Sequence, residues 1–176
     1  HLKTGFIKLD TVQALIQNLV RHQIQFDVLI LFWLGEPLLH PQFSKIYRLF
    51  LRASVQYGIF GSIEVHTNAI LLEESIQRVL LNNARLPQKI HCTIDAITDE
   101  TYLAVKGRNS LQESMQNTVE LIQKKNTLNC QHPRIVLQYI VGSNNVREVA
   151  PFLEYWEKAF QDSNSDYFVS AGQIPS

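Results

Sequence analysis

The sequence predicts an α/β fold built on a parallel β-sheet. Short apolar runs rich in β-branched and aromatic residues alternate with longer stretches whose apolar residues recur at helical spacing. About five strands can be recognised in this way, at a spacing of roughly 25 to 45 residues, which leaves room for helical connections between them. Strands that alternate with helices form parallel sheets with right-handed crossovers.

The first expected elements are an amphipathic helix that begins near Leu9 and a strand over residues 28–33. The helix is indicated by apolar residues at helical spacing, namely Leu9, Val12, Ile16, Leu19 and Val20. The strand, Val-Leu-Ile-Leu-Phe-Trp, is too short to span a membrane and is continuously apolar. We therefore expect it to be buried on both faces of the sheet.

The turn after this strand, residues 35–41, reads Gly-Glu-Pro-Leu-Leu-His-Pro. Gly35 permits a backbone geometry that other residues resist, and Pro41 suits the first turn of the next helix. Glu36 places a carboxylate at the carboxyl end of the strand, where α/β folds hold their ligands. The same composition also fits an ordinary capped turn whose glutamate is solvated, so this stretch alone leaves both interpretations open.

The remaining elements follow the same plan of strand, polar turn and helix. Further strands are expected over residues 63–67, 89–94 and 134–141 and from residue 167, with helices over 43–57, 72–80, 98–105, 110–122 and 149–160. Three helix starts contain the pattern of a capping box: Asp10 with Gln13, Ser110 with Glu113, and Asn145 with Glu148.

Such a sheet can be doubly wound or curled into a barrel. No Gly-x-Gly-x-x-Gly follows the first strand and no phosphate-binding Gly-x-x-x-x-Gly-Lys-Ser/Thr occurs, which weakens the nucleotide-binding doubly wound folds. A complete or partial barrel is favoured. The 176 residues are enough for one domain with a substantial core, so residues 1–176 are expected to form a single domain.

Composition narrows the possible partners. Sixteen basic residues balance sixteen acidic ones, so no net charge attracts nucleic acid or an anionic membrane. No apolar run approaches the roughly 20 residues of a membrane span. The two cysteines, Cys92 and Cys130, lack the spacing of a zinc site or a disulfide framework, which fits a soluble, cytoplasmic protein. The chain starts at His1 and its last residues complete no element, so we expect a fragment of a longer protein.

Polar residues follow the carboxyl end of each predicted strand. In a parallel sheet these ends lie on one rim, so the side chains should converge there. They are Glu36, Thr67, Asn68, Thr93, Asp95 and Asn144. A carboxylate, amides and hydroxyls around one mouth suit a zwitterionic or hydroxyl-rich small molecule. The set contains no nucleophile with an adjacent base.

Other reactive side chains are weaker candidates. His66 should point to the face opposite Thr67, which favours a packed or surface histidine, and we leave it out of the site. Cys92 inside a strand is expected to act as a small buried hydrophobe. Lys106 and Arg108 form either a solvated corner or a contact for a substrate carboxylate.

The order of these motifs resembles the radical S-adenosylmethionine enzymes, in particular the SPASM-like branch with peptide- and protein-modifying members. Residues 34–41, Leu-Gly-Glu-Pro-Leu-Leu-His-Pro, resemble the family's Gly-Gly-Glu-Pro-Leu-Leu-His-Pro turn after its second strand. Residues 67–69, Thr-Asn-Ala, resemble the turn after the third strand, and residues 93–96, Thr-Ile-Asp-Ala, resemble Ser-Leu-Asp-Gly after the fourth. Residues 136–148 resemble the fifth strand and the start of its helix.

The resemblance implies a partial (β/α)6 TIM-type barrel with parallel strands, its first strand missing from this chain. It also implies an S-adenosylmethionine site. Gly35 and Glu36, with Pro37 in the same turn, would receive the amino group of the cofactor. Asn68, Thr93 and Asp95 would line its ribose and methionine portion, and Gln138 would face it. No residue is assigned a catalytic or metal-binding role.

Two departures from the family pattern stand out. Leu34 occupies the position of the first glycine in the Gly-Gly-Glu turn. The Cys-x-x-x-Cys-x-x-Cys triplet that binds a 4Fe-4S cluster is absent, because it belongs after the first strand, upstream of the leading helix. The cluster ligands are therefore expected outside this chain, and the 176 residues alone are expected to be inactive.

Two functional hypotheses follow. In the first, the full-length protein is a radical enzyme in which the reduced cluster splits S-adenosylmethionine, and the 5′-deoxyadenosyl radical takes a hydrogen atom from a peptide, protein or small-molecule substrate. An electron donor such as flavodoxin or ferredoxin would then be a partner, and an auxiliary domain would lie after Ser176. In the second, the chain is a non-catalytic scaffold or binding module that has lost the cluster. Either way, the missing first strand predicts that residues 28–33 have an unpaired edge or take a partner from elsewhere.

Overall fold

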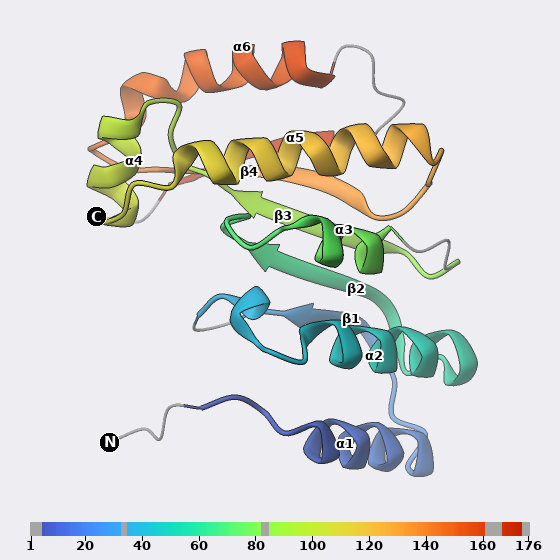
Figure 1. Cartoon of the computed structure of the whole chain (residues 1–176). Coiled ribbons are helices and arrows are strands. Elements are labelled where there is room, and N and C mark those ends of the chain that lie inside the picture. The colour runs from blue at the N-terminus through green and yellow to red at the C-terminus, as the bar shows by residue number, and fades with distance from the viewer. Residues whose placement is uncertain (1–4, 33–34, 82–84, 161–166, 174–176) are drawn as a thin grey trace.

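The chain folds around one parallel sheet of five strands in the order β1-β2-β3-β4-β5 (Figure 1). The computed structural model describes residues 5–32, 35–81, 85–160 and 167–173, the last of these as backbone. The strands are β1 (Phe26–Leu31), β2 (Phe60–Thr67), β3 (Gln88–Thr93), β4 (Arg134–Val141) and β5 (Tyr167–Gln173). In the register, His66 lies opposite His91 and Thr93 lies opposite Gln138.

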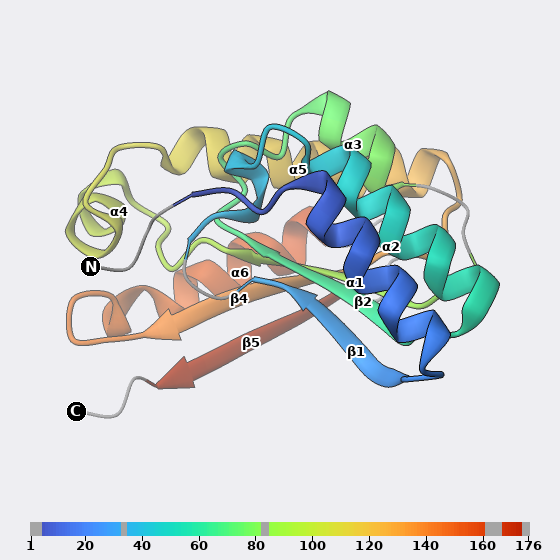
Figure 2. The same cartoon turned by 90° about the horizontal axis from the view of Figure 1, so that it is seen from below.

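One helix precedes the first strand, the others connect successive strands, and the described helices lie on one side of the sheet (Figure 2). They are α1 (Leu9–Arg21), α2 (Phe43–Tyr57), α3 (Glu74–Leu80), α4 (Asp99–Lys106), α5 (Leu111–Thr127) and α6 (Val149–Phe160), with short 3-10 turns η1 (Pro37–Leu39) and η2 (Val146–Glu148). Strands in sequential order with helices on a single side are the arrangement of a TIM-type barrel, whereas a doubly wound sheet reverses its strand order and has helices on both faces. The prediction of a partial TIM-type barrel is confirmed.

The core lies between the sheet and its helices. Alternate strand residues face the helices and are buried, among them Ile63 and Val65 on β2 and Leu137 on β4. On the same face, the ring of Tyr139 meets Phe152 of α6 edge-on at 4.6 Å. The alternate residues, such as His66, His91 and Gln138, face the other way. On that side of the sheet no described helix lies (Figure 2). We refer to it as the open face.

The expectation that the first strand is buried on both faces is wrong. Strand β1 pairs with β2 alone among the described strands, and Phe26, Val28 and Ile30 are 51%, 41% and 50% exposed. The unpaired edge expected at this strand is therefore confirmed for β1, while Trp33 and Leu34 lie outside the described residues. An apolar run is typical of a central strand, but composition alone cannot place a strand at the centre of a sheet.

The three predicted capping boxes do not form. Lys8 is the N-cap of α1, so Asp10 already lies inside the first helical turn. Ser110 is the N-cap of α5 and Asn145 that of η2, but neither side chain makes a capping hydrogen bond. Pro41 precedes α2, which begins at Phe43, and Pro37 is the proline that opens a helical turn, η1.

Candidate functional site

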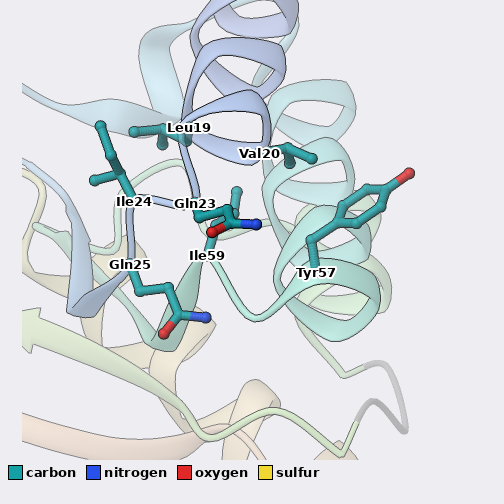
Figure 3. Close-up of a pocket in the computed structure, with 7 residues that line it drawn as sticks. All are labelled: Leu19, Val20, Gln23, Ile24, Gln25, Tyr57 and Ile59. Atoms are coloured by element: carbon teal, nitrogen blue, oxygen red, sulfur yellow. The ribbon is translucent and has the colours of Figure 1, made fainter.

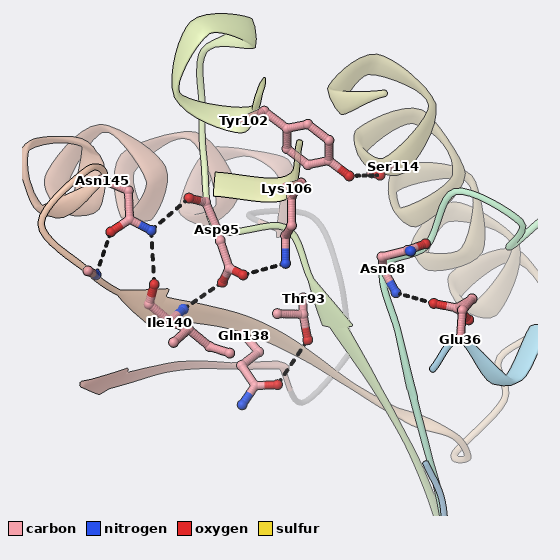
Figure 4. Close-up of polar contacts among 11 residues, drawn as sticks. Glu36, Asn68, Thr93, Asp95, Tyr102, Lys106, Ser114, Gln138, Ile140 and Asn145 are labelled. Atoms are coloured by element: carbon pink, nitrogen blue, oxygen red, sulfur yellow. Dashed lines mark hydrogen bonds and ion pairs between the residues drawn. The ribbon is translucent and has the colours of Figure 1, made fainter. Parts of the chain in front are cut away.

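The strands end on one rim, where the side chains predicted from the sequence lie on neighbouring turns (Figure 4). At the end of β1, Gly35 has a φ of 128°, a conformation open to glycine but strained for other residues. The chain then turns into η1, for which Glu36 is the N-cap: its Oε1 accepts from Leu38 N at 3.1 Å. The Glu36 carboxylate is thereby fixed at the carboxyl end of β1.

The same carboxylate links β1 to β2. Its Oε1 also accepts from Thr67 Oγ1 at 2.7 Å, and its Oε2 accepts from Asn68 N at 2.8 Å. A carboxylate has about four acceptor positions, and the described residues fill three of them. One position on Oε2 is left for a ligand donor.

Further hydrogen bonds stabilise the turn after β2. Ala69 adopts a φ of 63°, and its N–H donates to Thr67 Oγ1 at 3.0 Å. Asn68 Oδ1 accepts from Ile70 N at 3.1 Å, so the other end of its amide, Nδ2, is left to donate elsewhere. Asn117 of α5 donates to the carbonyls of Ala69 and Ile70. The sequence did not single out Asn117, because its partners are 47 and 48 residues away.

Glu36 and Asn68 line one pocket at the rim, which we call the rim pocket. Its volume is about 370 Å³, and its lining consists of Glu36, Leu39, Asn68, Ile70, Leu71, Tyr102, Lys106 and Arg108. Helix α4 ends at Lys106, and Gly107, with a φ of 69°, caps it and leads to Arg108. The pocket therefore combines a carboxylate and an amide with two cations, groups that can bind both ends of an amino acid zwitterion.

Asp95 has a different environment from the one expected. Its side chain is 3% exposed; Oδ1 accepts from Ile140 N at 2.6 Å and Oδ2 pairs with Lys106 Nζ at 2.5 Å (Figure 4). Both carboxylate oxygens thus have protein partners, and Asp95 is not among the residues that line the rim pocket. It connects the ends of β3 and β4 to α4 and holds the Lys106 ammonium in place.

Asn145, which was expected to cap a helix, instead joins the ends of β3 and β4. It is 1% exposed. Its Nδ2 donates to the carbonyls of Asp95 and Ile140, at 3.0 and 2.9 Å, and its Oδ1 accepts from Gly142 N at 2.7 Å (Figure 4). The expected pairing with Glu148 is absent, because Glu148 accepts from Thr98 and Thr101 at the start of α4.

Thr93 and Gln138 form a pair of their own on the open face. Thr93 Oγ1 donates to Gln138 Oε1 at 2.9 Å, as the register of β3 and β4 places them side by side (Figure 4). Neither residue lines the rim pocket. The structure thus brings Glu36 and Asn68 together, connects Asp95 to them through Lys106, and leaves Thr93 with Gln138.

Gly35 and Pro37 line a second cavity beside the same turn. Its volume is about 670 Å³, and Glu36 takes part in it as well, so this carboxylate lies between the two cavities. His40 forms part of its wall and is held at both ring nitrogens: Nε2 lies 2.9 Å from Ile7 O and Nδ1 accepts from Gln42 N at 3.0 Å. This histidine therefore stabilises the turn and the residues before α1.

A third cavity lies at the opposite end of the sheet. Its volume is about 470 Å³, and its lining, shown in Figure 3, is Leu19, Val20, Gln23, Ile24, Gln25, Tyr57 and Ile59. Gln25 and Ile59 directly precede β1 and β2, which places this cavity at the amino ends of the strands. Ligands of α/β folds bind at the carboxyl ends, so we do not assign it to the site.

The two cysteines do not fit an iron–sulfur cluster. Cys92 is fully buried on the helix-facing side of β3, and burial raises the pKa of its thiol to about 12. Cys130 is 6% exposed and follows α5. A cluster is held by several thiolates that converge on one point, and this chain provides no such set. Separately, none of the described helices combines the length and apolar character that crossing a membrane requires.

A solved structure aligns with nearly the whole of this chain, whereas the sequence comparisons find nothing similar. No family model and no curated protein matches the sequence. Among solved structures, SuiB of Streptococcus suis bound to S-adenosylmethionine aligns with a TM-score of 0.48 and 10% sequence identity. The alignment covers 97% of this chain and 55% of SuiB, so the chain spans about half the length of that protein. A likeness at this level does not assign the chain to a family.

Proposed function

We propose that this chain is the S-adenosylmethionine-binding core of a radical S-adenosylmethionine enzyme. The observation that carries the proposal is the state of Glu36: three protein donors fix its carboxylate, and the acceptor position that remains belongs to a residue of the rim pocket. The order of the turns at residues 34–41, 67–69 and 93–96, which resembles that family, gives independent support.

The rim pocket has groups that match the methionine portion of S-adenosylmethionine. The ammonium of the cofactor can donate to Glu36 Oε2, and its carboxylate can pair with Lys106 or Arg108. The free Nδ2 of Asn68 can donate to a ribose oxygen. Asp95 acts indirectly in this scheme, because its ion pair holds Lys106 at the pocket.

The reaction we propose for the full-length protein is hydrogen-atom abstraction from a peptide, protein or small-molecule substrate. S-adenosylmethionine supplies the radical chemistry when it is bound and reduced. The electron would come from a 4Fe-4S cluster whose ligands lie outside this chain, with flavodoxin or ferredoxin as donor. The residues of this chain bind and orient the cofactor.

Calorimetric titration of the 176-residue chain with S-adenosylmethionine tests the binding step. Glu36→Gln removes the charge from the ammonium contact, and hydrogen bonds to charged groups are worth about 1.5–3 kcal/mol, so affinity should fall by roughly 10- to 150-fold. Glu157→Gln makes the same charge change at an exposed position on α6 that does not line the pocket and should bind like the wild type. Equal affinity for Glu36→Gln and wild type would contradict the proposal.

We also consider a second function, because the two buried cysteines cannot hold a cluster. The chain would then be a binding module for S-adenosylmethionine without redox chemistry. Anaerobic reconstitution of the full-length protein with iron and sulfide, followed by reduction, separates the two. Release of 5′-deoxyadenosine supports the radical enzyme, whereas binding without any release supports the module.

A further inference from the structure

Three side chains that the rim pocket does not use meet on the open face of the sheet. Glu64 and His66 are alternate residues of β2, so they share a face, and His91 of β3 lies directly opposite His66. Glu64 Oε2 is 3.6 Å from His66 Nε2 and 3.5 Å from His91 Nε2. One ligand atom from each residue lies within 4.8 Å of the other two.

The two imidazole nitrogens in this cluster lack a hydrogen-bond partner. His66 Nε2 and His91 Nε2 are both buried atoms without a partner within the described part of the chain. Their distances to Glu64 exceed the 2.7–3.2 Å typical of a hydrogen bond that involves nitrogen. Buried polar atoms are nearly always satisfied, because leaving one unpaired costs about 1–3 kcal/mol. A shared partner between the two rings and the carboxylate would satisfy both nitrogens.

We propose that Glu64, His66 and His91 bind a divalent transition-metal ion, with Zn²⁺ as the best match. Two imidazoles and a carboxylate are a common ligand set for this ion. Tetrahedral bonds of 2.0–2.1 Å put neighbouring ligand atoms about 3.4 Å apart. The separations of 3.5 and 3.6 Å from Glu64 Oε2 to the two nitrogens are close to that value.

Lys89, beside the cluster, orients the Glu64 carboxylate. Lys89 Nζ donates to Glu64 Oε1 at 2.8 Å, which leaves Oε2 turned toward the histidines, the kind of outer contact that orients metal ligands. The Lys89 ammonium opposes a dication, but its side chain is 46% exposed and can turn toward solvent.

The rings must turn for both nitrogens to reach one ion. His66 and His91 are stacked, with centroids 4.0 Å apart and planes inclined by 19°. Lone pairs that lie in nearly parallel planes do not converge on a point, so at least one ring has to rotate about its Cβ–Cγ bond. Both side chains remain partly exposed on the open face, at 21% and 18%, although Phe32 stacks on His66 at 5.5 Å. Metal binding should therefore change the ring contacts of His66.

Three protein ligands leave a coordination position free. In zinc sites of this composition the free position holds water or a substrate oxygen. Here it would face the uncovered side of the sheet, where Lys89 also lies. The site is separate from the rim pocket, since none of its three ligands lines that pocket, and it stands whether or not the proposed function holds.

Titration of the metal-free chain with Co²⁺, followed by its visible absorption, tests this site. Wild type should bind one equivalent and show the bands of a tetrahedral nitrogen and oxygen site. His66→Ala and His91→Ala should each weaken binding by about tenfold or more. His22→Ala removes an exposed histidine at the end of α1 and should leave the titration unchanged.

Competition and thermal unfolding complete the test. Zn²⁺ should displace Co²⁺ and raise the melting temperature of wild type but not of His91→Asn, a smaller polar replacement that guards against a folding defect. Intense near-ultraviolet thiolate bands would assign the ion to a cysteine and overturn the proposal. So would binding that the His66 and His91 variants leave unchanged, or the absence of binding, which would make the cluster a metal-free histidine pair.

Discussion

Glu36 shows how the meaning of a residue depends on its neighbours in space. Its sequence context fits an ordinary capped turn, and the structure does show it capping η1. The same carboxylate also receives Thr67 and Asn68 from the next strand, and it lines the rim pocket. The capping and binding interpretations, which the sequence left as alternatives, are therefore compatible in one side chain.

Asn145 gives the sharpest stability prediction at this scale. Asn145→Ala removes three hydrogen bonds of a buried side chain, two to the carbonyls of Asp95 and Ile140 and one from Gly142 N. We expect a loss of about 2–4 kcal/mol in the free energy of unfolding, measured by urea denaturation. Asn144→Ala, at the exposed neighbouring position, should change it by less than about 0.5 kcal/mol. Similar losses in the two variants would refute the role assigned to Asn145.

Sequence reasoning located the rim residues but not their individual partners. Glu36 and Asn68 share a pocket as expected, because parallel strands bring their ends together. Asp95 was expected at the cofactor, but its partners Ile140 and Lys106 come from a strand and a helix whose relative position only tertiary packing decides. The sequence did not predict the cluster of Glu64, His66 and His91, because His91 comes beside His66 only when β2 and β3 pair.

At the scale of elements, strand positions were predicted better than helix starts. The bounds of β4 agree with the predicted residues 134–141, since alternation and flanking turns are local signals. The capping box expected from Asn145 and Glu148 does not form because groups distant in the sequence bind both side chains. Glu148, for example, accepts four hydrogen bonds from Ile97, Thr98 and Thr101 rather than pairing with Asn145.

The link between η2 and α4 through Glu148 should depend on pH. Burial acts to raise the pKa of Glu148, but the hydrogen bonds from Thr98, Ile97 and Thr101 outweigh it and hold that pKa below its ordinary value. The ionised form therefore stabilises the fold above the unfolded pKa of about 4.3, and this contribution is lost as the pH falls through the folded pKa.

Chemical denaturation across the pH range checks this link. Glu148→Gln should be less stable than wild type at neutral pH, and the difference should shrink in acid. Glu157→Gln, at an exposed position on α6, should show no such trend. A Glu148→Gln deficit that stays constant down to strongly acid pH would mean that ionisation of Glu148 is not what stabilises the contact.

For the whole molecule, alternating strands and helices predicted the parallel sheet, and the missing nucleotide motifs favoured a barrel. The sequence could not predict that all described helices lie on one side of the sheet. A buried strand face has the same apolar composition whether a helix or another part of the protein covers it. The same limit explains why β1 was expected to be covered on both faces.

The exposed edge should make the 176-residue chain prone to self-association. No described strand pairs with the outer edge of β1, so its backbone groups beside Phe26, Val28 and Ile30 are a template for another strand. Ile30→Lys places a charge at this edge and should lower the apparent mass measured by light scattering at high concentration. Val55→Lys replaces an apolar residue that is 59% exposed on α2 and should not lower it. A wild type that stays monomeric at every concentration would contradict self-association through the edge of β1.

The central claim, that the rim pocket binds S-adenosylmethionine, is tested most directly by amide chemical shifts of the labelled chain during titration with the cofactor. Saturable shifts should appear at Gly35, Asn68 and Gly107, which lie in or beside the rim pocket, and not at Gln25 or Gly58 near the opposite end of the strands. Shifts confined to that opposite end, or no shifts at millimolar cofactor, would contradict it.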